Sequence, residues 1–340
     1  MAYTDIDKPS DYFETILWSA VDTSITGLDF QPDWVWIKSR TNADTQVLFD
    51  AVRGTGKRLS SSGTTAEQTK TDELTAFNSD GFTIGTGDNV NRSGHNYVSW
   101  NWKAGGSASS NSDGSITSSV SVSTDAGFSI VQWSGNGSGG ASVGHGLGVA
   151  PDVIIKKRTD DGSGAWYLYN KVLGNTKSIY LNYNFAVATS GAWNNQTPSS
   201  TVFYNGSGSA ENGGTMISYC FASKKGFSKF GSYTGNGNAD GTFVYTGQKS
   251  AFIMIKQTNA SGEDWFICDT KREGYNAENN RLLPNLNSAE STDSPIDILS
   301  NGFKARQSGA AVNGSGASYI YMAFAENPFV TSTGVPTTAR

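Results

Sequence analysis

Charged residues are scarce in this sequence. Asp, Glu, Lys and Arg together make up 16% of the 340 residues, and the formal net charge is −5 with both signs interspersed. A nucleic-acid-binding protein needs a basic patch, so this charge distribution argues against nucleic acid as a partner. No apolar run approaches the roughly 20 residues of a membrane span. Residues 1–8 lack the basic-then-apolar order of a signal peptide, so we expect synthesis in a cytoplasm and no membrane insertion.

Cysteine and histidine are almost absent, with two of each. Cys220 and Cys268 both lie in apolar strand patterns, which predicts buried thiols and not a disulfide framework. His95 and His145 have no Cys or His neighbours at ligand spacing, which argues against a zinc site. We therefore predict no metal and no cofactor.

Strong helix formers are also scarce, whereas glycine and aromatic residues are abundant. The chain has 40 glycines, and 12% of its residues are aromatic. Helices favour Ala, Glu, Lys and Leu, and strands favour aromatic and β-branched residues. The composition therefore predicts an all-β protein.

A short apolar run closed by a lysine occurs three times. The first copy is Asp33–Lys38, the second is Asp152–Lys156, and Ala251–Lys256 is a more divergent third. Such runs, bounded by Gly and Pro, are typical of buried strands. Since one strand cannot bury itself, each copy predicts a small β module, and the chain is a tandem array of about three modules.

Other segments repeat in the same order. Gly127–Gly137 corresponds closely to Gly226–Gly237, and each ends in Asn-Gly, a strong hairpin signal. The strand that closes each repeat carries large apolar residues at alternate positions, which predicts one buried face. These residues are Val98, Trp100 and Trp102, then Ile217, Tyr219 and Phe221, then Ile320, Met322 and Phe324.

These correspondences predict three antiparallel β-sandwich modules in tandem. We place the first repeat at 12–105, the second at 127–224 and the third at 225–328. Residues 1–11 and 329–340 form N-terminal and C-terminal arms. Residues 106–126 are a Gly/Ser-rich linker or an additional edge strand. A strand is considered because Ile116, Val120 and Val122 all stand at even-numbered positions and would point to the same face.

No catalytic constellation emerges. Gly140–Gly144 matches the G-x-S-x-G pattern with His145 following, but no helix signal accompanies it, so a glycine-rich loop is favoured. Asn236–Gly241 resembles the start of a Ca²⁺ loop, yet Gly247 stands where an EF-hand needs glutamate; a turn-bound Ca²⁺ stays open as an alternative.

Paired carboxylates are the other candidate chemistry, because glycoside hydrolysis needs two of them. Asp50, Asn170 and Asp269 occupy one repeat position, and the Asn in the second repeat speaks against a shared acid–base role. We expect hydrogen-bonded turn residues there.

Three aromatic residues are the candidates for ligand binding. Trp18, Trp133 and Tyr233 share one repeat position beside a Gly-rich turn. An exposed aromatic there could stack on a sugar ring. The alternative is a core aromatic, which the pattern alone favours.

The repeated strings resemble a module common in virion proteins of marine bacteriophages, cyanobacterial phages among them. The resemblance covers nearly the whole chain. It rests on Gly27–Arg40, Leu48–Gly54, Asp80–Gly85, Val98–Gly106, Ala126–Val131, Gly144–Gly148 and Ala323–Phe329. The third repeat departs from the pattern, because Tyr245–Lys249 replaces the Gly-Leu-Gly-Phe-x-Pro-Asp string.

The resemblance implies lectin-like or jelly-roll-like β-sandwiches in a tail-fibre-like structural protein of a virion, assembled in the host cytoplasm, without catalytic residues to carry over. The chain shows no collagen-like repeat or heptad stalk, which favours a compact capsid-decorating appendage. We expect a non-enzyme that docks on other capsid or tail proteins, forms a homo-oligomer and attaches to host surfaces. The alternatives are a glycan-binding adhesin and a polysaccharide depolymerase.

Overall fold

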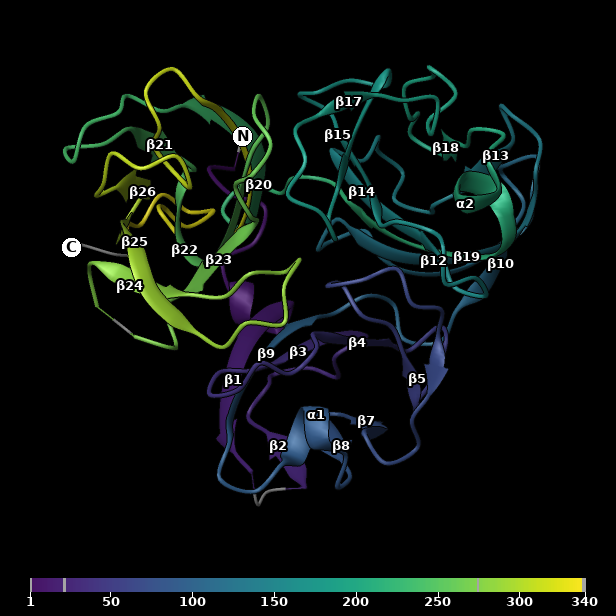
Figure 1. Ribbon diagram of the computed structural model, residues 1–340, viewed down its shortest axis with the longest axis horizontal. Helices are drawn as coiled ribbons and strands as arrows, with labels where there is room; N and C mark the ends of the chain where they lie inside the picture. The colour runs from purple at the N-terminus through teal and green to yellow at the C-terminus, as the bar shows by residue number, and fades with distance from the viewer. Residues whose placement is uncertain (1, 21–22, 274, 338–340) are drawn as a thin grey trace.

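The computed structural model describes residues 2–20, 23–273 and 275–337, and this part of the chain is built from antiparallel sheets (Figure 1). Its helices are short: η1 (Pro9–Asp11), α1 (Asp88–Asn91) and α2 (Ser209–Asn212). The all-β prediction is confirmed.

One main sheet forms in each repeat, and the closing strand lies in its middle. In sheet order the first contains β1 (Phe13–Ser19), β9 (Asn96–Trp102), β3 (Trp34–Ser39) and β4 (Val47–Asp50). The second contains β10 (Ser109–Asn111), β11 (Ser118–Ser123), β12 (Phe128–Asn136), β19 (Gly213–Phe221), β14 (Val153–Arg158), β15 (Tyr167–Asn170), β16 (Lys177–Tyr180) and β17 (Ala188–Thr189). The third contains β20 (Ser228–Thr234), β27 (Ser318–Pro328), β22 (Gln248–Gln257) and β23 (Phe266–Asp269).

A smaller sheet accompanies each main sheet. In the first repeat it contains β2 (Ser24–Thr26), β8 (Gly81–Ile84) and β7 (Leu74–Asn78). In the second it contains β13 (Ser142–Gly144) and β18 (Val202–Tyr204). In the third it contains β21 (Phe243–Tyr245), β26 (Gly302–Ala305), β25 (Ser291–Leu299) and β24 (Glu278–Arg281). A further pair joins β5 (Lys57–Arg58) to β6 (Gln68–Thr69).

The three main sheets meet around one common core, with the repeats arranged as a ring in Figure 1. All nine closing-strand residues predicted to share a buried face belong to this common core. Aromatic contacts join every pair of repeats: Trp34 to Tyr219 with ring centroids 4.3 Å apart, Phe13 to Phe324 at 5.2 Å, and Phe221 to Phe324 at 5.8 Å. The repeats are therefore not independent domains in a linear array, because each depends on the other two to cover the inner face of its main sheet.

The other face of each main sheet covers a local core that belongs to one repeat. In β3, Trp34 and Trp36 point to the common core, whereas Val35 and Ile37 point to the local core. A strand with both faces covered must be apolar at successive positions, since neighbouring side chains point to opposite sides. This explains the unbroken apolar runs of the lysine-ended strands.

Residues 106–126 contain β10 and β11, which extend the second main sheet beyond β12. Val120 and Ile116 are buried in the local core of the second repeat, as their shared parity requires. Ile116 also forms a parallel bridge to Val143 in β13. The segment thus covers an edge of the second repeat.

The two terminal arms lie against the third repeat and against each other. Thr4 Oγ1 donates to the Lys225 carbonyl at 2.5 Å, and Ile6 belongs to the common core. The backbone N–H of Ser332 donates to Asp7 Oδ1 at 2.6 Å. The described residues of the two predicted arms therefore contact their own chain.

Candidate functional site

The three aromatic candidates lie in the local cores. Trp18 and Trp133 are buried, and Tyr233 packs against its local core with its ring stacked on Tyr319 at 4.8 Å. Their polar atoms also have internal partners, because Trp18 Nε1 donates to the Val90 carbonyl and Tyr233 Oη to the Val312 carbonyl. Stacking on a sugar needs an exposed ring face, so this position does not offer a sugar platform in the present arrangement.

The lysines that end the repeated strand are buried, and the register corrects one assignment. Lys38 pairs with Val98, Lys157 with Ile217 and Lys256 with Ile320, so the second repeat's counterpart is Lys157 and not Lys156. Burial lowers the pKa of each of these three ammonium groups to about 8. Lys157 Nζ donates to the Thr64 carbonyl of the first repeat at 2.8 Å, so it joins two repeats.

Lys156 instead enters the local core of the second repeat. Its ammonium donates to the Ala192 carbonyl at 2.8 Å and Asn205 Oδ1 at 2.9 Å, and it lies 4.3 Å from the centre of the Trp193 ring. Burial lowers its pKa to about 7. A buried amine of this kind is a candidate for chemistry, but all of its contacts are internal and it lines none of the cavities described below.

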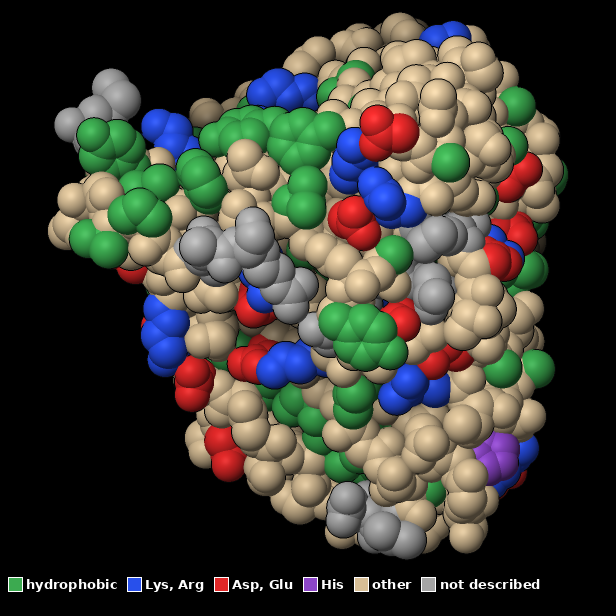
Figure 2. All heavy atoms as spheres, turned by 90° about the vertical axis from the view of Figure 1, so that its left-hand side faces the viewer, with side chains coloured by type: hydrophobic (Ala, Val, Ile, Leu, Met, Phe, Trp, Pro, Cys, Tyr) green, Lys and Arg blue, Asp and Glu red, His purple; other side chains and the backbone are tan. Residues whose placement is uncertain are grey.

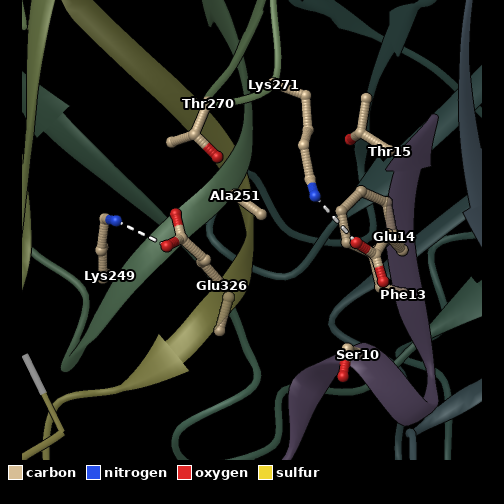
Figure 3. A pocket seen from close by; sticks show the side chains of 10 residues that line it. Ser10, Phe13, Glu14, Thr15, Lys249, Ala251, Thr270, Lys271 and Glu326 are labelled. Carbon is tan, nitrogen blue, oxygen red and sulfur yellow. Dashed lines mark hydrogen bonds and ion pairs between the residues drawn. The ribbon is translucent and has the colours of Figure 1, made fainter. Parts of the chain in front are cut away.

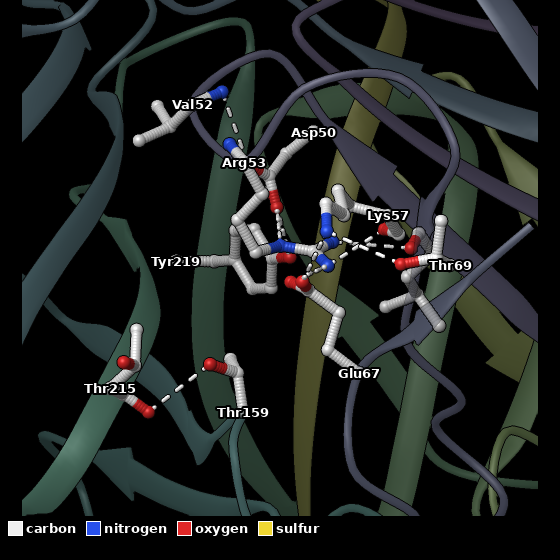
Figure 4. A network of polar contacts seen from close by, with 10 residues as sticks. Asp50, Val52, Arg53, Lys57, Glu67, Thr69, Thr159, Thr215 and Tyr219 are labelled. Carbon is white, nitrogen blue, oxygen red and sulfur yellow. Dashed lines mark hydrogen bonds and ion pairs between the residues drawn. The ribbon is translucent and has the colours of Figure 1, made fainter. Parts of the chain in front are cut away.

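Asp50 lies in a buried polar cluster between the first and second repeats (Figure 4). Its Oδ1 accepts the backbone N–H of Val52 and Arg53, the turn role expected for this position. Its Oδ2 lies 2.6 Å from Arg53 Nε and accepts the Tyr219 hydroxyl at 2.8 Å. Burial raises the pKa of Tyr219, which keeps this hydroxyl protonated as a donor. The cluster has a structural role, because Asp50, Arg53 and Tyr219 all find their hydrogen-bond and ion-pair partners inside the protein.

The other two repeat boundaries contain the counterparts of this cluster. Asp269 Oδ2 lies 2.6 Å from Arg272 Nε and accepts the indole N–H of Trp100, from the first repeat, at 3.0 Å. In the second repeat Asn170 and Leu173 stand where the Asp and Arg stand elsewhere. In the closing strand of the third repeat, Met322 occupies the position that Tyr219 occupies in the second repeat and Trp100 in the first. Two boundaries are thus ionic and the third is uncharged.

A ring of hydrogen bonds also joins the repeats, from the residue that precedes each of β4, β15 and β23. Trp166 Nε1 donates to the Ser60 carbonyl at 2.7 Å, and Trp265 Nε1 donates to the Tyr180 carbonyl at 2.8 Å. Gln46 Nε2 donates to the Leu283 carbonyl at 2.7 Å. The Trp166 bond joins the second repeat to the first, and the Trp265 bond joins the third to the second. The Gln46 bond joins the first repeat to the third and so closes the ring.

The serine motif and the glycine-rich turn have structural partners. Ser142 lies in β13 and its backbone carbonyl accepts from Ile116, while His145 is buried and accepts from the Leu147 backbone through Nδ1. Asn236 Oδ1 accepts from the side chain of Asn313, which ties the turn to its own repeat. No group of three His, Cys, Asp or Glu side chains suited to a metal occurs among the described residues.

A cavity of about 290 Å³ lies at the boundary between the first and third repeats (Figure 3). Two carboxylates line it, and each has a lysine partner: Glu14 with Lys271 at 3.0 Å, and Glu326 with Lys249 at 2.6 Å. A glycosidase pair would keep one carboxyl as an acid and one as a base. Here both carboxylates are ion-paired, and the Glu14–Lys271 pair joins the first repeat to the third, which suits a structural contact better than an acid–base couple.

A second cavity of similar volume, about 290 Å³, has a different chemistry. We call it the tyrosine–lysine groove. It is lined by Tyr3, Ser223, Lys224, Lys225, Gly226, Ser228, Lys229, Tyr245, Thr246 and Gly247. The exposed fractions of Tyr3 and Tyr245 are 71% and 61%, so both rings face solvent. On the face shown in Figure 2, exposed hydrophobic side chains gather beside charged ones of both signs.

The groove has unbalanced positive charge. Within the described residues, the ammonium groups of Lys224, Lys225 and Lys229 form no ion pair. Asp5 is nearby, where its carboxylate accepts the backbone N–H of Lys225 at 3.1 Å, and the three lysines outnumber this one carboxylate. Exposed aromatic rings beside unpaired cations suit a ligand with apolar surface and negative charge. This groove is the candidate binding site.

Sequence reasoning missed this groove because its parts are far apart in the chain. Tyr3 belongs to the N-terminal arm, and Tyr245 lies in the string where the third repeat departs from the other two. That departure was the available signal, since a loop that breaks a repeat pattern often serves a separate role.

Comparisons with known proteins identify a family without an assigned activity. A family model described as "Domain of unknown function (DUF7483)" matches residues 8–328. No curated protein and no solved structure matches the chain. Among the described residues, no helix is long and apolar enough to span a membrane.

Proposed function

The chain belongs to the DUF7483 family, whose description names no activity, and we propose from its own residues that it is a structural protein on the surface of a bacteriophage particle. It acts by contact, docking on capsid or tail proteins and attaching the particle to its host. The observation that carries this proposal is the tyrosine–lysine groove, where exposed aromatic rings lie beside lysines on the outer surface.

Two further features support a role in contact. The repeated strings resemble those of phage virion proteins and cover nearly the whole chain. The three repeats interlock through the common core, the ionic clusters and the ring of hydrogen bonds. Such a closed body presents its outer surface at fixed positions, which suits a subunit of a larger assembly.

We also propose that each repeat is a β-sandwich of the lectin or jelly-roll kind, with its main and small sheets enclosing the local core. Homo-oligomers are part of the proposal, because strand edges on the outside of such units commonly pair.

Particle association is the direct test. Particles from an infected culture are purified on a density gradient, and peptides of this protein are quantified by mass spectrometry in the particle and soluble fractions. We expect a constant copy number per major capsid protein across the particle peak. Recovery in the soluble fraction alone would reject the virion assignment.

A glycan-binding adhesin is the second candidate, because Tyr3 and Tyr245 expose aromatic rings beside a shallow groove. Aromatic faces bind the apolar faces of sugar rings, and the lysines would favour acidic saccharides. A glycan array with neutral and acidic host polysaccharides tests this. Binding that is lost in Tyr245→Ala and kept in Trp133→Phe would favour the adhesin.

A further inference from the structure

The second repeat shows how a strand edge in this fold can be covered. β11 pairs antiparallel with the outer edge of β12, with Ser118 opposite Trp133 and Val122 opposite Ser129. Ile116, which precedes β11, bridges to Val143 in β13, so this segment lies between the main sheet and the small sheet. It is a segment of the same chain that lies in a strand-binding site.

In the third repeat, no strand among the described residues occupies the corresponding space. The register equates β20 with β12 and β21 with β13, because Val143 pairs with Phe203 and Val244 pairs with Phe303 in the respective small sheets. Among the described strands, β27 alone pairs along β20. Lys224 bridges to Ser228 at the start of β20, and beyond it residues 229–233 have an open outer edge.

The residues around this open edge differ from those around β11. Gly144 in β13 lies so close to the Asn111 side chain that a Cβ there would collide with it. In the third repeat the corresponding position is Tyr245, whose side chain is exposed. The tyrosine–lysine groove lies at the Ser228–Lys229 end of β20, and a cavity of about 390 Å³ reaches Ser232–Thr234 at the other end.

The corresponding edge of the first repeat lies in a different environment. There β1 borders the cavity in which Glu14 is paired with Lys271 and Lys249 with Glu326. Charge at that edge is balanced, whereas the edge of β20 ends beside three lysines without carboxylate partners in the described part of the chain. Charge complementarity therefore singles out the third repeat and selects an acidic occupant.

We propose that an extended acidic segment of a partner polypeptide adds to the outer edge of β20 as β11 adds to β12. Its backbone pairs with residues 229–233, its carboxylates meet Lys229 and Lys224, and its apolar side chains pack on Tyr245. Main-chain hydrogen bonds provide affinity and the flanking side chains provide selectivity, as in other cases of strand addition. The inference rests on the proposed docking function and names the kind of partner.

The β11 register supplies a probe for this site. A peptide of residues 113–122 carries the β11 pattern, and transfer of the register places its Val122 position opposite Lys229. The peptide with Val122→Asp therefore sets a carboxylate against the Lys229 ammonium in a cross-strand pair. The probe stops at this position because Lys224 already occupies the next one in the third repeat.

Binding of the fluorescein-labelled probe to the full-length protein is measured by polarisation at low salt. We expect the Val122→Asp peptide to bind at least tenfold more tightly than the Val122→Lys peptide, and Lys229→Glu to reverse that order. Lys229 is exposed, so this variant folds normally, which circular dichroism verifies. A copy of the probe with methylated backbone nitrogens on its pairing edge is expected to lose binding.

Three outcomes would overturn the proposal. Absence of binding at millimolar peptide would show that the edge is blocked, since edge lysines can also prevent strand pairing. Equal binding of the N-methylated copy would show contact without strand addition. Binding of a sulfated oligosaccharide in place of the peptide would assign the groove to a glycan. Any of these leaves the particle-association result untouched, so the two proposals fail separately.

Discussion

The hydroxyl of Tyr219, from the closing strand of the second repeat, lies 2.8 Å from Asp50 Oδ2 in the first repeat. The same oxygen lies 2.6 Å from Arg53 Nε, and both side chains of that ion pair are at most 1% exposed. One carboxylate oxygen thus forms an ion pair within the first repeat and accepts a hydrogen bond from the second.

We predict that Asp50→Asn destabilises the protein by about 3–5 kcal/mol, because the variant leaves the buried Arg53 guanidinium without the opposite charge of its carboxylate partner. The free energy of unfolding from guanidinium denaturation measures this loss. A loss below 1 kcal/mol would show that Glu67, at 3.2 Å from Arg53, suffices as the partner.

The third boundary supplies the control for this variant. It carries Asn170, Leu173 and Met322 at the three corresponding positions. The triple variant Asp50→Asn, Arg53→Leu, Tyr219→Met reproduces that uncharged set, and we expect it to recover most of the lost stability. Replacement of a buried ion pair by well-packed apolar residues is often neutral or stabilising.

The indole hydrogen bonds of the ring give a second prediction. Trp166→Phe removes the indole donor of the part-buried bond to the Ser60 carbonyl and should cost about 0.5–1.5 kcal/mol in the free energy of unfolding. Trp265→Phe should cost a similar amount, since Trp265 makes the same contact to Tyr180. Unequal effects would show that these two boundaries are not equivalent in strength.

Buried lysines predict a pH dependence of stability. Lys157 has a pKa of about 8 in the folded protein, below its ordinary value of 10.5. Between these values the unfolded chain binds a proton that the folded chain releases, so the free energy of unfolding rises with pH, by up to ~1.4 kcal/mol per unit for one lysine. Below about pH 8 both states are protonated and this gain is absent.

Lys157→Met should therefore flatten the rise in stability between pH 8 and pH 9.5, as urea denaturation at each pH would show. The matched control is Lys171→Met, because the Lys171 side chain is 68% exposed. An unchanged slope in Lys157→Met would mean that the Lys157 ammonium stays charged in the folded state across this range.

The common core predicts one cooperative unfolding transition for the whole chain. Each inner sheet face is covered by the other repeats, so a fragment of residues 127–224 exposes a large apolar surface. We expect this fragment to bind a hydrophobic dye and to lack a cooperative thermal transition. Two or more transitions in the calorimetric trace of the full chain would contradict this.

Trp18 and Tyr245 should separate stability from binding. Trp18→Ala should cost about 3–5 kcal/mol because Trp18 is buried in a local core. Tyr245→Ala should change stability by less than about 0.5 kcal/mol, because the ring is exposed. Attachment of the purified protein to particle proteins or host cells should fall for Tyr245→Ala, although this variant remains folded.

The sequence predicted the repeats and which alternate residues of each closing strand are buried, since large apolar residues such as Trp100 alternate there with small polar ones. It did not predict that these faces meet in a common core, because parity does not tell which partner covers a face. It placed Lys156 where the strand register places Lys157, since two adjacent lysines cannot be distinguished by pattern. The groove escaped prediction because Tyr3 and Tyr245 meet through the fold alone.

Closure of the hydrogen-bond ring fixes how many copies this architecture can hold. A linear array can gain or lose a copy by duplication or deletion in its gene and keep its geometry. Here Gln46 of the first repeat completes the circle with Leu283 of the last, so a fourth copy would have no place and a missing one would leave an open gap. Copy number is therefore a property of the fold, and length variants of this protein should arise at the termini and loops and not by whole repeats.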